Sequence, residues 1–466
     1  MFKNSRLFAL LSFVLLIGLL AACSGGDGKD ANNSKDSDGK EAVEISVWLT
    51  PQWQGVLDAT EEGADYDSFF KHAAEKFAEE YDKYDVKVNV EVIAGDQRDE
   101  LLNVNLNGGT PPDIFFESTF AMEEFVHRGA ILPITELIDD EARSDIDANF
   151  LETVTFGDDI YFYPFSHMPG TLVYNADMLK DAGLEDYIGG EDEIKTWTIE
   201  ELEEILYGVK ENLPRDKYTN AYPMSLFAVN NQGDTWNLAY LRMFGNEVYD
   251  AEGNIVFNDE KGVKALEWLK KIYDEELTNP GAESVSSNDA LAMFQNQQLA
   301  ISFTNSVLFN NKKADMENGE APEFDMRLAN IPSVSGDPLS FTYVTGAALF
   351  DTGDDKRIEV SKDFVKFFSS DEELVKSSKN GVPVRSSVAE QFKDENPLFE
   401  AYDKNAQYMF DFTGSVPGYN QLREVLYPEL QALFTGQKTA EEAAKSYEEK
   451  GNEVIEESRA DSVIHN

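Results

Sequence analysis

The chain has 466 residues, with 88 Asp and Glu against 39 Lys and Arg, and a formal net charge of −49. This excess of negative charge excludes the basic surface that nucleic-acid binding requires, and it disfavours adhesion to anionic lipid headgroups. The length exceeds that of a usual single hydrophobic core, so we expect two domains or lobes.

The first residues of the chain have the pattern of an export signal. Two basic residues precede an apolar run over residues 7–20, which is too short for a permanent bilayer-spanning helix. The run ends in LAAC at residues 20–23, which resembles the lipobox of bacterial lipoproteins. The resemblance implies a signal peptide over residues 1–22, cleavage before Cys23 and acylation of its thiol. The alternative is an ordinary signal peptide followed by a chance cysteine, although Cys23 is the only cysteine in the chain.

The segment after the lipobox is typical of a tether. Residues 24–40 read SGGDGKDANNSKDSDGK, and such a composition buries too little apolar surface to offset its ordering entropy. We therefore predict a flexible linker over residues 23–40. Because no second apolar run of membrane-spanning length follows, we expect a protein held at the extracellular side of the cell membrane by its lipid alone.

Strands and helices alternate in the first part of the folded region. Apolar residues at every second position predict strands over residues 43–49 and 86–93, and an apolar run predicts a third strand over residues 112–116. Helical segments separate them, and the first helix places four side chains on one face: Phe70, Ala73, Phe77 and Tyr81. This alternation predicts a parallel sheet with helices on its faces.

Later segments carry clear helix and turn signals. Capping boxes at residues 198–201 and 439–442 predict helix starts, and the second helix should run to about residue 457. Residues 262–273 have an amphipathic helical pattern, and residues 250–254 are typical of a hairpin tip. We expect three of the five tryptophans to have structural roles in the core or beside a helix start: Trp48, Trp197 and Trp268.

Eight short motifs occur in order along the chain. They are GTPPDI at 109–114, GAILP at 129–133, GDDIYFYP at 157–164, YNADML at 174–179, TWTIEEL at 196–202, MFQNQQLAI at 293–301, GVPVR at 381–385 and FTGQKTAEEA at 434–443. Together they resemble the extracellular solute-binding proteins of family 1, the carbohydrate-binding subunits of bacterial ABC importers, to which maltose-binding protein belongs. Gln297 departs from the glycine usual in its motif. The resemblance covers about residues 43–457.

The resemblance implies a two-lobed, periplasmic-binding-protein-like α/β fold with a hinge and an interlobe cleft. Lobe 1 would comprise residues 41–163 and 346–397, and lobe 2 residues 164–345 and 398–466. Hinge closure around an oligosaccharide or sugar acid would precede delivery to ABC permease subunits in the membrane. We expect a monomer in the receptor role.

Motifs for catalysis or metal binding are absent from the sequence. We find no nucleophile elbow, Walker loop, zincin helix or paired-cysteine site, so we expect no enzyme activity, no cofactor and no metal. The four histidines are dispersed. His72 falls in a helix, His127 on a predicted surface helix and His465 in the tail, whereas His167 follows a crossover motif and is a candidate ligand contact, with a structural or solvent role as the alternative.

Aromatic and polar residues near strand ends are the candidate carbohydrate contacts. Aromatic rings cover the C–H faces of sugars, and carboxylates and amides bond to their hydroxyls. Trp236 is a candidate contact, with packing between helices as its alternative role. Gly346 is a candidate because a glycine could admit a ligand close to the backbone. The predicted ligand-binding residues are Trp53, Glu117, Ser118, His167, Trp236, Asn305, Tyr343, Gly346 and Tyr419.

Two other functions stay open at the level of the sequence. A secreted carbohydrate-active enzyme would be recognised by turnover of a glycan, because 88 acidic residues make an apparent carboxylate pair uninformative. A sensory sugar receptor would present its ligand to a membrane kinase instead of a permease. The sequence identifies neither the sugar nor the membrane partner.

Overall fold

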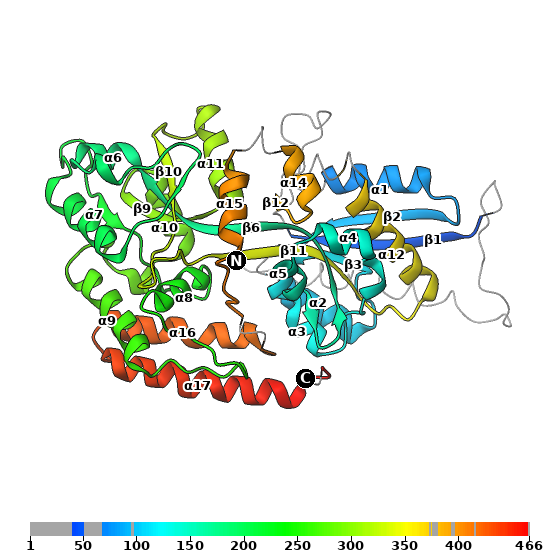
Figure 1. Cartoon of the computed structure of the whole chain (residues 1–466). Helices are drawn as coiled ribbons and strands as arrows, with labels where there is room; N and C mark the ends of the chain where they lie inside the picture. Colours follow the sequence, from blue (N-terminus) through cyan, green and yellow to red (C-terminus); the bar gives the residue numbers. More distant parts are fainter. Residues whose placement is uncertain are drawn as a thin grey trace, which may run out of the picture.

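The computed structural model describes residues 40–50, 68–94, 97–371, 374, 381–392, 397–413 and 416–464. It has two α/β lobes joined by two long strands (Figure 1). The predictions for Cys23, Trp53 and His465 fall outside the described residues. No helix in the described ranges is both long enough and apolar enough to cross a membrane.

The first lobe confirms the predicted alternation of strands and helices. Strands β1 (Ala42–Leu49), β2 (Asp85–Val92) and β3 (Ile114–Ser118) pair in parallel, in the order β2-β1-β3. The other elements of this part of the chain are α1 (Ser68–Glu80), α2 (Arg98–Gly108), α3 (Thr119–His127), η1 (Thr135–Leu137), α4 (Asp140–Asp145), α5 (Ala148–Glu152), β4 (Thr155–Phe156) and β5 (Asp159–Ile160). The carboxyl ends of β1 to β3 point toward the second lobe (Figure 1).

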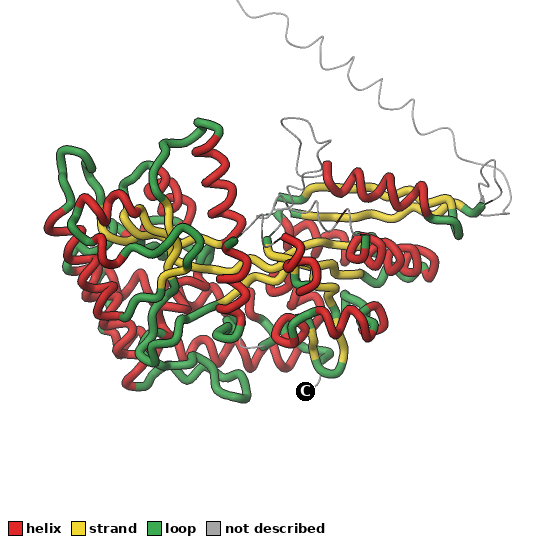
Figure 2. The backbone as a smooth tube through the Cα atoms, turned by 45° about the horizontal axis from the view of Figure 1, so that its top comes forward, coloured by secondary structure: helices red, strands yellow, loops and turns green. Residues whose placement is uncertain are grey.

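Two antiparallel strands carry the sheet from one lobe into the other. Strand β6 (Phe162–Asn175) pairs with β11 (Phe341–Leu349), and β11 in turn pairs with β3. The resulting sheet has the order β2-β1-β3-β11-β6-β10-β7, in which β10 is Met326–Ala329 and β7 is Ile194–Lys195. Further pairs are made by β8 (Tyr222–Met224), β9 (Leu299–Asn305) and β12 (Val382–Pro383). Figure 2 shows these strands continuing through the middle of the molecule.

The second lobe is richer in helix. Its capping boxes are confirmed, because Thr198 and Glu201 cap one helix and Thr439 and Glu442 another, each side chain bonding to the other residue's backbone N–H. The elements between the crossover strands are α6 (Ala176–Asp181), η2 (Glu185–Tyr187), β7 (Ile194–Lys195), α7 (Ile199–Asn212), β8 (Tyr222–Met224), α8 (Asp234–Arg242), α9 (Glu260–Asp274), η3 (Ala282–Ser284), α10 (Ser287–Gln295), β9 (Leu299–Asn305), α11 (Ser306–Glu317) and β10 (Met326–Ala329).

After β11 the chain returns to both lobes. Helix α12 packs on the first lobe, where Phe368 stacks on Phe70 with ring centroids 4.9 Å apart. The last two helices cover the second lobe (Figure 1). The elements of this return are α12 (Asp355–Ser370), β12 (Val382–Pro383), α14 (Ser386–Phe392), α15 (Leu398–Ala406), α16 (Tyr419–Phe434) and α17 (Ala440–Asp461).

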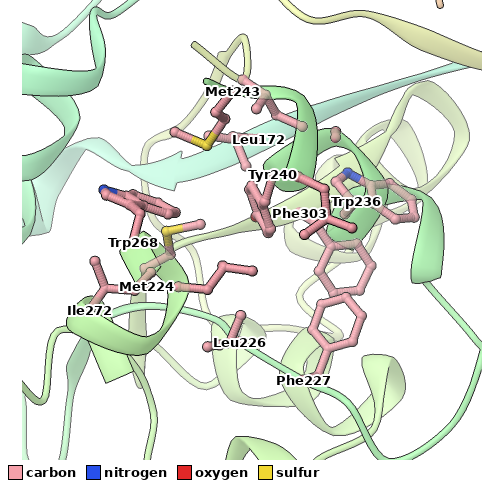
Figure 3. Close-up of a cluster of buried hydrophobic side chains, with 14 of the residues drawn as sticks. Leu172, Met224, Leu226, Phe227, Trp236, Tyr240, Met243, Trp268, Ile272 and Phe303 are labelled. Carbon is pink, nitrogen blue, oxygen red and sulfur yellow. The ribbon is translucent and has the colours of Figure 1, made fainter. Parts of the chain in front are cut away.

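Each lobe has its own hydrophobic core. On β6, Phe165 belongs to the core of the first lobe and Leu172 to that of the second. On β11, Phe341 belongs to the second core and Val344 to the first. Figure 3 shows part of the second core, around Trp268 and its neighbours. The boundary between the two cores therefore crosses the middle of both strands.

The prediction that His127 lies on a surface helix is wrong. Helix α3 packs against β11 and α16, and His127 is only 9% exposed. Its Nδ1 lies 2.8 Å from Ser462 Oγ, and its carbonyl accepts a hydrogen bond from Val463. The sequence did not reveal that the end of the chain covers this residue, because that contact joins segments more than 300 residues apart.

Replacement of Phe77 tests the packing of the first lobe. Phe77 is 3% exposed and packs edge-on against Phe364, with ring centroids 5.2 Å apart. We expect Phe77→Ala to lower the free energy of unfolding by about 3–5 kcal/mol, because it leaves a cavity in the core. Urea denaturation measures the loss. Val104→Ala, at a position 61% exposed, is the control and should change stability by less than about 0.5 kcal/mol. A Phe77→Ala loss as small as that of the control would contradict the packing.

Candidate functional site

Four aromatic rings meet where the lobes join. Tyr343 of β11 lies with its ring centroid 5.4 Å from that of Phe120 and 5.5 Å from that of Phe412. Tyr419, at the start of α16, lies 5.8 Å from Phe412 and 6.2 Å from Phe120. These four rings are called the interlobe aromatic cluster below. Since Phe120 comes from α3 and Tyr419 from α16, the cluster joins elements of both lobes.

Glu117 and Ser118 lie at the carboxyl end of β3, directly before α3, the helix that carries Phe120. Glu117 is 5% exposed, and its Oε1 accepts a hydrogen bond of 2.6 Å from the Ser118 backbone N–H. Its Oε2 lies 3.8 Å from Arg98, the first residue of α2, which is also bonded to Asp99. Burial disfavours the charged form of Arg98, but the neighbouring carboxylates outweigh burial and raise its pKa.

A second ion pair approaches the cluster from the other lobe. Arg423 of α16 donates two hydrogen bonds to Asp234, at 2.9 and 3.0 Å. Burial disfavours the charged form of Arg423, but Asp234 raises its pKa overall. The guanidinium also lies over the ring of Phe120, 5.3 Å from its centroid. Because Phe120 belongs to α3, this contact connects the ion pair to the first lobe.

The chain places Asp234 through a local backbone feature. Gly233 has a φ of +77°, which favours glycine, and α8 begins at the next residue. A Cβ at Gly233 would lie 2.6 Å from the ring of Phe227, so a side chain has no room there. Asp234 thus stands at the N-terminus of α8, where a negative charge is favoured by the helix dipole.

Tyr419 contributes a buried hydroxyl. The side chain is 3% exposed, and no residue in the described part of the chain bonds to its Oη. Burial raises the pKa of the Tyr419 phenol well above its ordinary value, so the hydroxyl keeps its proton. It is available as a donor and acceptor beside three aromatic rings.

Trp236 lies behind the cluster instead of forming an open surface. Its indole is 3% exposed, and Nε1 donates a hydrogen bond of 3.1 Å to the Thr171 carbonyl. Figure 3 shows it among buried side chains beside Phe303, with ring centroids 4.6 Å apart. It also packs 6.0 Å from Tyr343. The structure therefore connects Trp236 to the cluster through Tyr343.

Asn305, Gly346 and His167 have structural partners. Asn305 ends β9, and its Oδ1 accepts a hydrogen bond from Leu308, which caps α11. A Cβ at Gly346 would lie 2.3 Å from the Tyr163 carbonyl, so the close neighbour of this glycine is strand β6. His167 bonds to the Thr342 hydroxyl at 3.0 Å, and burial lowers its pKa to about 3, which keeps the ring neutral.

His167 also lies on the other face of the crossover strands from Tyr343. It pairs directly with Val344, and cross-strand partners share a face whereas neighbours along a strand alternate. By the same rule Ser118, opposite Thr345, lies on the face of Tyr343, and Glu117, opposite Gly346, lies on the face of His167. The structure thus brings Tyr343 and Tyr419 together around Phe120 and Phe412, with Trp236 behind them. It separates His167 from this group.

Sequence reasoning missed Arg98, Asp234 and Arg423. Asp234 stands two residues before the predicted Trp236, and Arg423 one helical turn after Tyr419, so both were adjacent to candidate positions. A buried pairing between residues 189 positions apart leaves no local signal. Only the helical spacing of Tyr419 and Arg423 could have suggested that their side chains share a face.

The chain is similar to known proteins in both sequence and structure. The family described as bacterial extracellular solute-binding protein matches residues 61–374. The arabinooligosaccharide-binding protein of Bacillus subtilis is 22% identical over 381 residues, covering 80% of this chain and 77% of that protein. Members of the family are substrate-binding proteins and not enzymes.

Solved structures share the two-lobed fold. An ABC transporter solute-binding protein from Thermotoga lettingae, bound with α-D-tagatose, has a TM-score of 0.71 at 19% identity, covering 88% of this chain and 99% of that one. Maltose-bound MalE3 of T. maritima has a TM-score of 0.69 at 19% identity, covering 88% and 100%. The periplasmic-binding-protein-like fold implied by the motifs is therefore confirmed.

Breaking the Asp234–Arg423 pair tests its contribution to the fold. We expect Asp234→Asn to lower the free energy of unfolding by about 3–5 kcal/mol, because it leaves the Arg423 charge buried without its partner. Urea denaturation of the variant measures the loss. Glu449→Gln, which removes an exposed partner of Lys445, is the control and should cost less than about 1 kcal/mol.

The double variant Asp234→Asn with Arg423→Met completes this test. Removing both charges should recover part of the lost stability, since no unpaired charge is left in the protein. A double variant no more stable than Asp234→Asn alone would show that the loss comes from packing and not from the unpaired guanidinium.

Proposed function

Because the chain belongs to the bacterial extracellular solute-binding proteins, we propose that it binds a carbohydrate between its two lobes and delivers it to an ABC importer. The observation that carries this proposal is the interlobe aromatic cluster, with the Asp234–Arg423 ion pair of the second lobe beside it and the Glu117–Arg98 pair of the first lobe at the end of β3. Closure of the lobes would bring both ion pairs onto the same ligand.

The chemistry of the cluster suits a sugar. Ring faces pack on the apolar C–H faces of a pyranose or furanose, while ionised and hydroxyl groups bond to its hydroxyls. We assign the bonding to Glu117, Ser118 and the Tyr419 hydroxyl, and the packing to Tyr343 and Tyr419. Trp236 supports Tyr343 from behind. Trp53, predicted to follow the first strand, stays proposed as a further platform.

The charges of the site favour a neutral oligosaccharide over a sugar acid. Arg98 faces Glu117 and Asp99, and Arg423 faces Asp234, so neither guanidinium lacks a carboxylate. A sugar carboxylate would have to compete with these partners. Two of the similar proteins carry neutral sugars in their descriptions, an arabinooligosaccharide and maltose, which supports the same choice.

The membrane attachment follows from the lipobox. Acyl chains on Cys23 would hold the protein at the extracellular side of the membrane, and the predicted linker over residues 23–40 would let the lobes reach the permease. The extracellular location of the family agrees with this arrangement. We propose that the protein acts as a monomer in this role.

Titration with oligosaccharides tests the function. Calorimetry on protein carrying Cys23→Ser should show binding of maltotriose or arabinotriose and weaker binding of trigalacturonic acid. X-ray scattering should show a smaller radius of gyration with the bound sugar, and the melting temperature should rise with sugar concentration, because the ligand stabilises only the folded state. Tight binding without compaction, or a preference for the sugar acid, would contradict the proposal.

Sugar affinities of two variants and a matched control test whether the sugar binds in the proposed site. Glu117→Gln and Tyr419→Ala should each weaken binding about 10- to 150-fold, since a buried charged hydrogen bond or aromatic platform contributes roughly 1.5–3 kcal/mol. The control is Tyr207→Ala on α7, whose hydroxyl bonds to Glu275 far from the cluster. Equal affinities in all three variants would place the sugar elsewhere.

Replacement of Cys23 tests the anchor. Cys23→Ser removes the acyl site, and stable membrane retention needs more than one acyl chain, so we expect the protein in the medium or as an uncleaved precursor. Cell fractionation and mass determination distinguish these forms, with Ser24→Ala as the control that stays on the membrane. A processed Cys23→Ser protein that remained membrane-bound would disprove the lipobox interpretation.

A further inference from the structure

A pocket of about 280 Å³ lies on the other face of β11 from Tyr343. Thr342 and Val344 line it, and because side chains alternate along a strand, Tyr343 between them points away. The pocket opens among α3, the end of α5 and residues 409–413, which run beside the start of β11 through a hydrogen bond from Phe410 to Ser340. Phe120 and Phe412 of the interlobe aromatic cluster also line it, so the pocket borders the proposed sugar site from the other face of β11.

The charged residues that line this pocket are all acidic. Glu123 comes from α3, Glu152 from α5, and Asp411 from the segment beside β11. No Lys or Arg side chain is among the described residues that line it. An electronegative pocket of this kind attracts a cation.

Glu123 is the innermost of these carboxylates. It is only 3% exposed, and its Oε1 accepts no hydrogen bond from any residue that the structure describes. His127 Nε2 lies 3.7 Å away, within ion-pair distance of Glu123 but beyond hydrogen-bond distance, and no described residue bonds to that nitrogen. The other ring nitrogen of His127 is bonded to Ser462. A buried acceptor without a donor is costly, so a ligand that brings an N–H group would be stabilised here.

Aromatic rings form much of the remaining wall. Phe120, Phe156, Phe410 and Phe412 all line the pocket. The faces of aromatic rings attract cations. The guanidinium of Arg242 lies over the ring of Phe410, 4.5 Å from the ring centroid. Phenyl rings do not ligate metal ions, and no cluster of three His, Cys, Asp or Glu suited to a metal occurs among the described residues. The lining therefore suits an organic cation better than an inorganic one.

We propose that this pocket binds a small primary alkylammonium compound, with its N–H groups donated to Glu123 and its carbon chain against the phenylalanine rings. The need for an N–H donor at Glu123 favours a primary amine over a quaternary ammonium. Glu152 and Asp411 lie exposed at the rim, so a second ammonium group would be bound there. A pocket of about 280 Å³ has room for a diamine of four carbons.

The protonation of Glu123 makes the proposed binding depend on pH. Burial raises the pKa of Glu123 to about 7, with His127 opposing the shift and Asp411 adding to it. The other charged group lining the pocket is Glu152 on α5. Since the ammonium needs the ionised carboxylate, affinity should rise about tenfold between pH 6 and pH 8.

Calorimetry with 1,4-diaminobutane on the full-length protein in detergent tests the proposal. We expect binding at pH 8, weaker binding of butylamine and none of 1,4-butanediol, which has the same length without charge. Glu123→Gln should lower the diamine affinity tenfold or more. It should still fold, because glutamine resembles the protonated carboxyl that is already populated near neutral pH.

Glu124→Gln is the matched control, since Glu124 is the next residue of α3 and its carboxylate pairs with Arg128 instead. This variant should bind the diamine like the unchanged protein. Equal diamine affinity in Glu123→Gln and Glu124→Gln would overturn the proposal. So would binding of tetramethylammonium as tight as that of butylamine, or the absence of any amine binding. None of these outcomes depends on whether the protein binds a carbohydrate.

Discussion

The pairing of β6 with β11 holds both lobes in one sheet and fixes the face on which each central side chain lies. The register runs from Phe341 opposite Gly170 to Ala348 opposite Phe162, with a bulge at Gly346. A side chain at Gly346 would collide with the Tyr163 carbonyl, so this glycine allows the close approach of the two strands. A slip by one residue would exchange the two faces of β11 and move Tyr343 out of the interlobe aromatic cluster.

The two faces of these strands differ in their electrostatics. On the face of Tyr343, Arg423 meets the carboxylate of Asp234, so the site presents polar groups with little net positive charge. On the face of Thr342, Glu123 is buried without a basic partner in the described lining, and burial raises the pKa of its carboxyl. Charges that are paired suit a neutral ligand rich in hydroxyls, whereas a buried carboxylate whose nearest basic group is a histidine 3.7 Å away suits a cation.

Local patterns in the sequence were sufficient for the elements but not for the contacts between them. The strands of the first lobe and both capping boxes were predicted, because apolar period and cap chemistry act over a few residues. The Asp234–Arg423 pair and the burial of His127 were not, since each depends on segments far apart in the chain. Gly346 was predicted to matter for a ligand, but strand packing already requires it.

Two side chains connect the sugar site to the second pocket. Phe120 and Phe412 contact Tyr343 in the interlobe aromatic cluster, and both also line the pocket that contains Glu123. Phe120 extends from α3 of the first lobe, so a change in the angle between the lobes moves one wall of each site. A ligand that prefers one lobe arrangement then changes the affinity of the other site for its own ligand. The sugar would change the affinity for the amine by the same factor as the amine changes the affinity for the sugar, because coupling free energies are reciprocal. The shared rings are thus the physical link through which occupancy of the pocket would act on closure around the sugar.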